Sequence, residues 1–305
     1  SSELVMNSSS KIGDAHRRKK KITPRQFGRR IAVVCACILI ALNVYRVWLK
    51  YRINEYRKNS ESSTPRVKTS KNVTCAARQN DLVQNCSPVR CGRVIQEGFI
   101  TREECGKIIE LAEFGMKHGG GAGGATILDF PSGALSRGNQ FINLHQLLSS
   151  KGQKLPQEGT RLLKEVIHRI RQEISNHFGV SSIMGTTPRF VSRMDQKPAQ
   201  NMHDEYWHEH VDANQYPGFE YTALIYLNDQ GLDYTGGLFS FIDEDIAKGQ
   251  AKVETISPKC GKLVYFTSGP ENVHRVHKVE SGLRYALTIA FTCDKSKELS
   301  GEWNA

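Results

Sequence analysis

Hydrophobic residues recur at helical spacing in two stretches of the chain. Over residues 160–178 an apolar residue falls at every third or fourth position, with charged residues between them, which predicts an amphipathic helix packed on a core. A shorter helical pattern follows Thr101. Glu104 stands three residues later, and this spacing is typical of a capping box. We therefore expect one helix beginning near residue 101 and a longer one over 160–178.

From residue 187 onward the hydrophobic period changes from that of helices to that of strands. Short runs rich in β-branched and aromatic residues are separated by Gly, Pro, Asn and Ser turn signals. The expected strands cover 188–193, 207–211, 222–227, 238–242, 252–256, 262–266 and 284–292. Since no long helical pattern interrupts them, we expect a mainly β protein with flanking helices, of α+β class. Its core should be an antiparallel sandwich or barrel of the jelly-roll type behind a helical N-terminal layer.

The longest uninterrupted apolar run, residues 31–42, lies near the N-terminus and continues as a mostly apolar segment to Leu49. This segment is long enough for a transmembrane helix if Arg46 extends its charged end toward the interface. A buried core helix and a cleaved signal peptide are the alternatives. Basic residues flank the run, however, and no small-residue cleavage site is visible. We therefore predict a single uncleaved anchor over 31–49.

Charge is distributed unevenly along the 305 residues. Residues 1–58 carry 14 of the 42 lysines and arginines but 3 of the 31 acidic residues, so residues 59–305 hold 28 of each. A formally neutral globular part lacks the electrostatic support for nucleic-acid binding. Nine basic residues lie between Lys11 and Arg30, compared with five between Arg46 and Lys58. This bias predicts a cytosolic N-terminus and a C-terminal part in the lumen of the secretory pathway.

Sequons and cysteines agree with a lumenal location. Asn72 and Asn85 each begin an Asn-X-Ser/Thr sequon for N-glycosylation. Six cysteines follow the anchor, at positions 75, 86, 91, 105, 260 and 293. Their even number permits disulfides in an oxidising compartment, although the pairing stays open. The predicted parts of the chain are a basic tail (1–30), the anchor (31–49), a polar stem (50–72), a cysteine-bearing collar (73–105) and a large domain (106–305).

His210 and Asp212 stand two residues apart, and His274 follows in a turn before the last predicted strand. Side chains two apart on a strand share a face, and the inward side chains of early and late strands meet in a barrel. Two imidazoles and one carboxylate that leave coordination positions open are the ligand set of a non-haem Fe(II) site. The sequence therefore predicts a metal site of these three residues.

Two further residues, Arg284 and Tyr226, can bind a keto acid beside the metal. Arg284 lies ten residues after His274 on the final predicted strand, and its guanidinium can bind the far carboxylate of a keto acid bidentately. Tyr226 can add a hydroxyl to that carboxylate. We expect both residues to hold the cosubstrate.

Other histidines compete for the ligand positions. His277 lies three residues after His274, but the ten-residue step to Arg284 favours His274. His208 lies two residues before His210 and is either structural or an extra ligand. We expect His277 beside a ligand or at the surface, and His208 outside the ligand set.

Residues 187–292 carry an ordered set of short motifs. The motifs are His210-Val211-Asp212, Tyr226-Leu227-Asn228, Gly236-Gly237-Leu238-Phe239-Ser240-Phe241, residues 258–266, His274-Arg275-Val276 and residues 282–287. In this order the set resembles the prolyl 4-hydroxylase branch of the 2-oxoglutarate and Fe(II)-dependent dioxygenases. Ten positions before His210, where many members have tyrosine, this chain has Gln200.

The resemblance implies a double-stranded β-helix over 187–292, with iron on His210, Asp212 and His274 and 2-oxoglutarate on Arg284 and Tyr226. It also implies O2 as cosubstrate, ascorbate as reductant, and conversion of 2-oxoglutarate to succinate and CO2. The coupled reaction hydroxylates a C–H bond, which we expect in a prolyl or lysyl side chain of a protein.

Two other functions are compatible with these residues. An inactive barrel that binds a lumenal partner or glycan would agree with the absent upstream tyrosine. Zinc hydrolysis could use the same three ligands, but no general base is near them and Arg284 would have no role.

Overall fold

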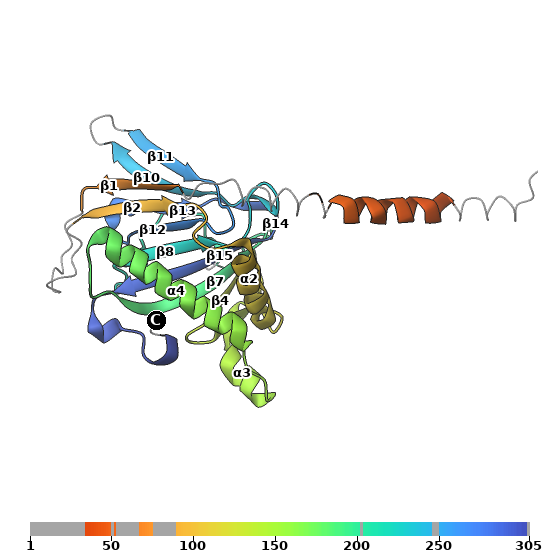
Figure 1. Ribbon diagram of the computed structural model, residues 1–305, viewed down its shortest axis with the longest axis horizontal. Coiled ribbons are helices and arrows are strands. Elements are labelled where there is room, and N and C mark those ends of the chain that lie inside the picture. Colours follow the sequence, from red (N-terminus) through yellow and green to blue (C-terminus); the bar gives the residue numbers. More distant parts are fainter. Residues whose placement is uncertain are drawn as a thin grey trace, which may run out of the picture. The chain divides into compact units, whose positions relative to one another are not determined.

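The computed structural model describes residues 34–49, 52, 67–75, 90–201, 204–245 and 250–303. The chain divides into two units, Ser1–Ser62 and Ser63–Ala305. In the first unit, residues 34–49 are helical (Figure 1). Among the described residues, no helix combines the length and apolar character that a membrane crossing requires. The anchor over 31–49 stays a prediction.

A large sheet forms the centre of the second unit. Its strand order is β1 (Lys68–Val73), β2 (Cys91–Gln96), β12 (Leu263–Thr267), β8 (Tyr221–Tyr226), β15 (Arg284–Thr292), β7 (Met184–Met194), β4 (Ala125–Asp129), β5 (Ala134–Gly138) and β3 (Gly120–Gly121), with β6 (Gln140–Asn143) paired to β5. The pairs are antiparallel except β3 with β5. Strands β7, β8, β12 and β15 confirm four of the predicted strands.

A smaller sheet packs against the large one. It consists of β11 (Gln250–Ile256), β10 (Phe239–Asp245) and β13 (His274–Val276), and a separate pair joins β9 (Tyr234–Gly236) to β14 (Val279–Gly282). Figure 1 shows β10 and β11 on the same side as β1, β2 and β12. The apolar cluster between the sheets contains Leu224, Tyr226, Phe239, Phe241, Ile256, Val264, Phe266 and Ala286. The predicted antiparallel sandwich is therefore present.

Helices cover the other face of the large sheet. They are α2 (Arg102–Met116), α3 (Leu144–Ser150) and α4 (Gln157–Phe178), and α4 runs across the sheet in Figure 1. The apolar residues of α4 at helical spacing are buried against strand residues in one core. At the start of α2, Thr101 Oγ1 accepts from the Glu104 N–H at 3.2 Å and Glu104 Oε2 accepts from the Thr101 N–H at 2.7 Å. Both predicted helices and the capping box are confirmed, and with them the α+β class.

Strand alternation decides which side chains enter the space between the sheets. On β15, Tyr285 and Leu287 pack in the helix-side core, whereas Ala286 packs between the sheets. Arg284 has the parity of Ala286, so its side chain enters the same interior. Tyr226 lies there too, at the end of β8. Both predicted cosubstrate residues thus face one space.

The predicted stem over 50–72 was too long, because residues 68–72 belong to β1. This strand pairs with β2 in the register Lys68↔Gln96 to Val73↔Cys91. The polar composition of β1 hid it, since an edge strand keeps polar side chains toward solvent. Asn72, one of the sequon residues, is exposed in it. Asn85 lies outside the described residues.

A disulfide between Cys75 and Cys91 joins the ends of β1 and β2, with Cα atoms 5.1 Å apart. Cys293 also takes part in a disulfide, and Cys105 and Cys260 are free thiols. Cys86 lies outside the described residues. Disulfides are typical of proteins in oxidising compartments.

Candidate active site

The three predicted metal ligands lie together. One ligand atom from each of His210, Asp212 and His274 lies within 4.8 Å of the other two, and no other such group of His, Cys, Asp or Glu occurs among the described residues. Asp212 Oδ1 is 3.6 Å from His210 Nε2 and 3.5 Å from His274 Nε2. Ligands of one ion are about 3–4 Å apart when each metal–ligand bond is about 2 Å long. The two distances suit a shared ion.

Backbone pairing brings the two histidines together across 64 positions of the sequence. The His210 N–H donates to the His274 carbonyl at 3.0 Å, and the His274 N–H donates back at 3.1 Å. Asp212 begins the short helix α5 (Asp212–Gln215). The predicted strand over 207–211 was wrong, because His210 alone pairs there, as an isolated bridge. Its partner strand β13 is three residues long and pairs over that length with β10.

Hydrogen bonds fix which nitrogen of each imidazole is free. His210 Nδ1 is 2.9 Å from the carbonyl of His208, and His274 Nδ1 is 2.9 Å from the carbonyl of Asn272. A carbonyl only accepts, so both Nδ1 atoms carry the proton and both Nε2 atoms are free to bind a metal. The His274 ring also stacks on Phe239, with centroids 5.2 Å apart. The site is thus preorganised for coordination.

Asp212 keeps one carboxylate oxygen for a metal because the other is already bound. Thr222 Oγ1 donates to Asp212 Oδ2 at 2.6 Å, and Ser268 Oγ lies 2.8 Å from the same hydroxyl. Burial would raise the pKa of Asp212, but His274, Thr222 and His210 together hold this pKa below its ordinary value. The carboxylate is therefore ionised at neutral pH.

Unpartnered polar atoms surround Arg284 in the interior. The hydroxyls of Tyr226 and Tyr234 and the Nη2 of Arg284 are buried without a hydrogen-bond partner in the part of the chain that the structure describes. The Arg284 guanidinium lies 5.4 Å from the centroid of the Tyr226 ring. Burial raises the pKa of Tyr226, and that of Tyr234 to about 12, although the nearby Arg284 acts in the opposite direction. Both hydroxyls remain protonated at neutral pH and can donate to an anion.

Gly237 lies close to the side chains of Arg284 and Tyr234. Its carbonyl accepts from Arg284 Nε at 3.0 Å, and its φ of +60° lies in the left-handed region that favours glycine. A Cβ at this position would stand 2.9 Å from Arg284 Cδ and 2.9 Å from Tyr234 Cε2. The Gly-Gly turn before β10 therefore packs directly against Arg284 and Tyr234.

The competing histidines lie outside the cluster. His208 is exposed, with Nε2 2.8 Å from Glu205 Oε2, and His277 Nε2 lies 2.8 Å from Ser240 Oγ. Both positions agree with the expectation from the sequence. The hydroxyl of Tyr206 accepts from the Val279 N–H at 3.1 Å, which leaves its own O–H free to donate.

Sequence reasoning missed Tyr234, Thr222 and Asn272. Tyr234 lies in a Gly-rich turn signal, and its nearness to Arg284 arises because β9 pairs with β14 just before that arginine. Thr222 has the same strand parity as Tyr226, which is the one signal that could have placed it in the interior.

Comparison with known proteins decides the family. Residues 197–292 match the 2OG-Fe(II) oxygenase superfamily. A Xenopus tropicalis protein, 2-oxoglutarate and iron-dependent oxygenase domain-containing protein 3, is 44% identical over 227 residues, which are 73% of this chain and 70% of that protein. This chain belongs to the 2-oxoglutarate and Fe(II) oxygenase superfamily. The Rattus norvegicus protein of the same name is 37% identical over 94% of this chain and 92% of its own length. Prolyl 3-hydroxylase 1 of Gallus gallus is 29% identical over 66% of this chain, but over 29% of its own length.

As a member of the superfamily, the chain is a 2-oxoglutarate-dependent dioxygenase that uses Fe(II) and 2-oxoglutarate. Its residues fit both. Two imidazoles and a carboxylate suit Fe(II) with positions left open, and the buried unpartnered donors around Arg284 suit a carboxylate. When bound, iron and the keto acid supply the activation of oxygen that hydroxylation of a C–H bond requires.

Proposed function

We propose that this chain is a membrane-anchored hydroxylase whose catalytic domain lies in the lumen of the secretory pathway. In this proposal it hydroxylates a prolyl or lysyl side chain of a protein. The observation that carries the catalytic part is the convergence of His210, Asp212 and His274 in a protein whose interior also holds unpartnered donors around Arg284. The similarity to prolyl 3-hydroxylase 1 supports a prolyl substrate.

Each residue of the site has one role in the proposal. His210, Asp212 and His274 hold iron through Nε2, Oδ1 and Nε2. Arg284 binds the far carboxylate of 2-oxoglutarate, and the hydroxyls of Tyr226 and Tyr234 donate to the same carboxylate. Thr222 and the carbonyls behind the two imidazoles orient the ligands.

The substrate enters on the His210 side. The side chain of His210 is 25% exposed, compared with 5% for His274 and 11% for Asp212. In this proposal residues 204–209, which directly precede His210, border the entrance. In this segment Trp207 lies under the Lys278 ammonium at 3.9 Å, which gives the substrate an aromatic surface beside a cation.

The lumenal location rests on several features that point the same way. Nine basic residues lie between Lys11 and Arg30, compared with five between Arg46 and Lys58, and this bias favours a cytosolic N-terminus. The Cys75–Cys91 disulfide favours an oxidising compartment. The exposed Asn72 is accessible for glycosylation. We retain the division into tail (1–30), anchor (31–49), stem, collar and oxygenase domain, with the end of the stem moved to residue 67.

The activity is tested with the full chain in detergent, supplied with Fe(II), 2-oxoglutarate, O2, ascorbate and proline- or lysine-containing peptides. We expect formation of succinate and a 16 Da mass increase of one peptide class, the mass of one added oxygen atom. Mn(II) with N-oxalylglycine, an unreactive analogue of the keto acid, should raise the melting temperature more than Mn(II) alone, because ligands that bind the folded state stabilise it. No change in melting temperature with either ligand would contradict the proposal.

The role of Tyr234 leads to a separate prediction. Tyr234→Phe removes a hydrogen bond to a charged group, which is worth about 1.5–3 kcal/mol. The Kd for 2-oxoglutarate should therefore rise about 10- to 150-fold, measured by titration of the Mn(II)-loaded protein. Tyr265→Phe is the matched control, because it removes another buried, unpartnered hydroxyl that belongs to the helix-side core. An equal Kd for the two variants would exclude Tyr234 from the pocket.

A further inference from the structure

The His274 imidazole is held from behind by a single backbone carbonyl. Asn272 provides this carbonyl, 2.9 Å from His274 Nδ1. Asn272 ends the short 3-10 turn Pro270–Asn272, and β13 begins at His274. The position of that carbonyl therefore sets the direction of His274 Nε2, which points at Asp212.

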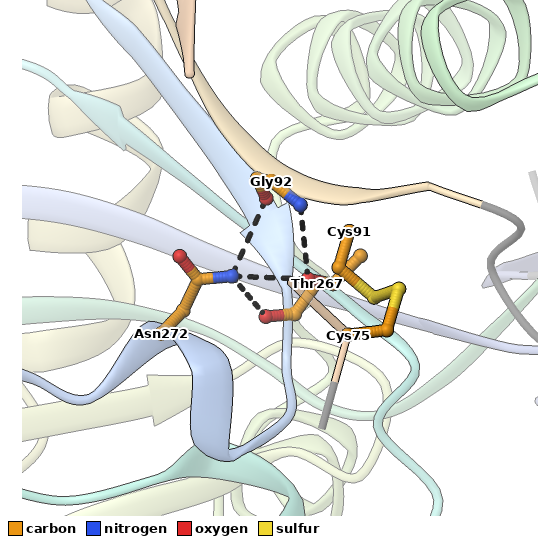
Figure 2. The surroundings of a disulfide bond; sticks show 5 residues. All are labelled: Cys75, Cys91, Gly92, Thr267 and Asn272. Atoms are coloured by element: carbon orange, nitrogen blue, oxygen red, sulfur yellow. Dashed lines mark hydrogen bonds between the residues drawn. A yellow bond between two sulfur atoms is a disulfide. The ribbon is translucent and has the colours of Figure 1, made fainter. Parts of the chain in front are cut away.

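The side chain of Asn272 is buried, with 1% of its surface exposed, and its amide is bound on several sides. Asn272 Nδ2 donates to the Thr267 carbonyl at 2.9 Å, to Thr267 Oγ1 at 3.0 Å and to the Gly92 carbonyl at 3.4 Å. Asn272 Oδ1 accepts from Arg93 Nη1 at 3.4 Å. Figure 2 shows the amide nitrogen between the Gly92 and Thr267 oxygens.

These contacts join the turn to two strands of the large sheet. Thr267 ends β12, and the Gly92 N–H donates to its hydroxyl at 3.4 Å. Gly92 follows Cys91, whose disulfide with Cys75 closes the end of the β1–β2 pair beside this cluster (Figure 2). A Cβ on Gly92 would stand 2.4 Å from the Lys71 carbonyl of β1, so β1 and β2 are in close contact here.

We propose that Asn272 is a positioning residue that fixes the metal ligand His274 to the end of β12 and to the disulfide-held strand β2. The hydrogen bonds from Asn272 to Thr267 are shorter than the one to Gly92. We therefore expect β12 to contribute more than the disulfide-held strand β2 to holding Asn272 in place. The inference rests on the proposed role of His274 as a ligand. It assigns a function in the active site to the N-terminal collar, which contributes no ligand itself.

The expected effect is on metal affinity. Loss of groups that orient a metal-binding histidine costs about 10- to 100-fold in affinity. Asn272→Ala should therefore raise the Kd of the full chain for Mn(II) about tenfold or more. Ser136→Ala is the control, because it removes a buried hydroxyl that accepts from the Ile127 N–H on β4. It should lower the melting temperature and leave the Mn(II) Kd unchanged.

Two substitutions at Thr267 separate positioning from stability. Thr267→Val keeps the shape but removes the hydroxyl that accepts from Asn272, so the Mn(II) Kd should rise. Thr267→Ser keeps the hydroxyl but loses a methyl group in a fully buried position. It should lower the melting temperature with a normal Kd. If the Kd instead follows the melting temperature across these variants, the role of Asn272 is structural only.

The contribution of the disulfide is measured with a double-mutant cycle. Substitution of both Cys75 and Cys91 by alanine should raise the Mn(II) Kd in the wild-type background and have no further effect in the Asn272→Ala background. Equal effects in both backgrounds, or none in either, would refute the link through Asn272.

His274→Ala distinguishes failure of this inference from failure of the proposed function. If His274→Ala binds Mn(II) as tightly as the wild type, the ligand assignment is wrong. If His274→Ala loses Mn(II) while Asn272→Ala retains normal affinity, the ligand assignment holds and the positioning role fails.

Discussion

Asp212→Asn is expected to abolish metal binding and 2-oxoglutarate turnover together. Asp212 Oδ1 faces both imidazoles, at 3.6 and 3.5 Å, so a neutral amide there removes the one negative charge of the ligand set. Loss of a residue that only orients a metal ligand raises the Kd about 10- to 100-fold. Loss of the ligand itself should raise the Mn(II) Kd by more than this. Titration with Mn(II) and succinate formation under Fe(II) measure the two effects.

Asp129 provides the control, because substituting this buried carboxylate should not weaken Mn(II) binding. Asp129 is buried on β4, where it accepts from the Arg189 N–H at 2.6 Å and from the Ser132 N–H at 3.1 Å. Asp129→Asn should lower the melting temperature and leave the Mn(II) Kd unchanged. If Asp212→Asn still binds Mn(II) with wild-type affinity, the ligand set is incorrect.

The histidines allow a second comparison within the same motif. His210→Ala should lose turnover, whereas His208→Ala should keep it. Both side chains lie in residues 207–212, but the ring of His208 is bound to Glu205 at the surface, away from the ligand group. Loss of turnover in both variants would mean that the loop as a whole, rather than His210, is required.

Much of the fold could be predicted because period-2 and helical patterns report burial directly. On β15 the alternation of core and interior residues follows from the pleat, and its predicted bounds, 284–292, are those observed. Helix α4 was equally visible because its apolar stripe packs on the sheet. Predictions from local pattern succeeded where one face of an element is buried.

Predictions failed where pairing partners rather than pattern decide the structure. Residues 207–211 have a strand-like composition, but β13 is short and pairs with β10, so a single bridge at His210 remains. Strand β1 has a polar composition and exists through its pairing with β2 and the Cys75–Cys91 disulfide. Neither partner can be identified from the segment itself.

In the candidate site, too, some residues could be predicted from local sequence and others depend on tertiary pairing. His210, Asp212, His274 and Arg284 could be identified from the order of their motifs along the chain. The strand that was expected to place His210 and Asp212 on one face is absent, because His210 pairs as an isolated bridge and Asp212 begins α5. Tyr234 could not be found in this way. Its hydroxyl reaches the pocket through the pairing of β9 with β14, a tertiary relationship with no local signature.

Arg284→Leu is expected to weaken 2-oxoglutarate binding while leaving metal binding intact. Removing one partner of a buried charged pair costs about 2–5 kcal/mol, which raises the Kd about 30- to 5,000-fold. Arg284→Lys should recover part of the affinity, because it retains the charge but not the bidentate fork. Titration of the Mn(II)-loaded protein with 2-oxoglutarate measures both variants.

Pyruvate provides the sharpest control for the role of Arg284. It shares the keto-acid end of 2-oxoglutarate but lacks the far carboxylate that Arg284 would bind. Its affinity for the Mn(II)-loaded protein should therefore be equal in the wild type and in Arg284→Leu, so the preference for 2-oxoglutarate disappears in the variant. Arg189→Lys, at another buried arginine whose Nη1 donates to the Trp303 carbonyl at 2.6 Å, should keep that preference. If Arg284→Leu weakens the two keto acids equally, the arginine supports the shape of the pocket instead of binding the distal carboxylate.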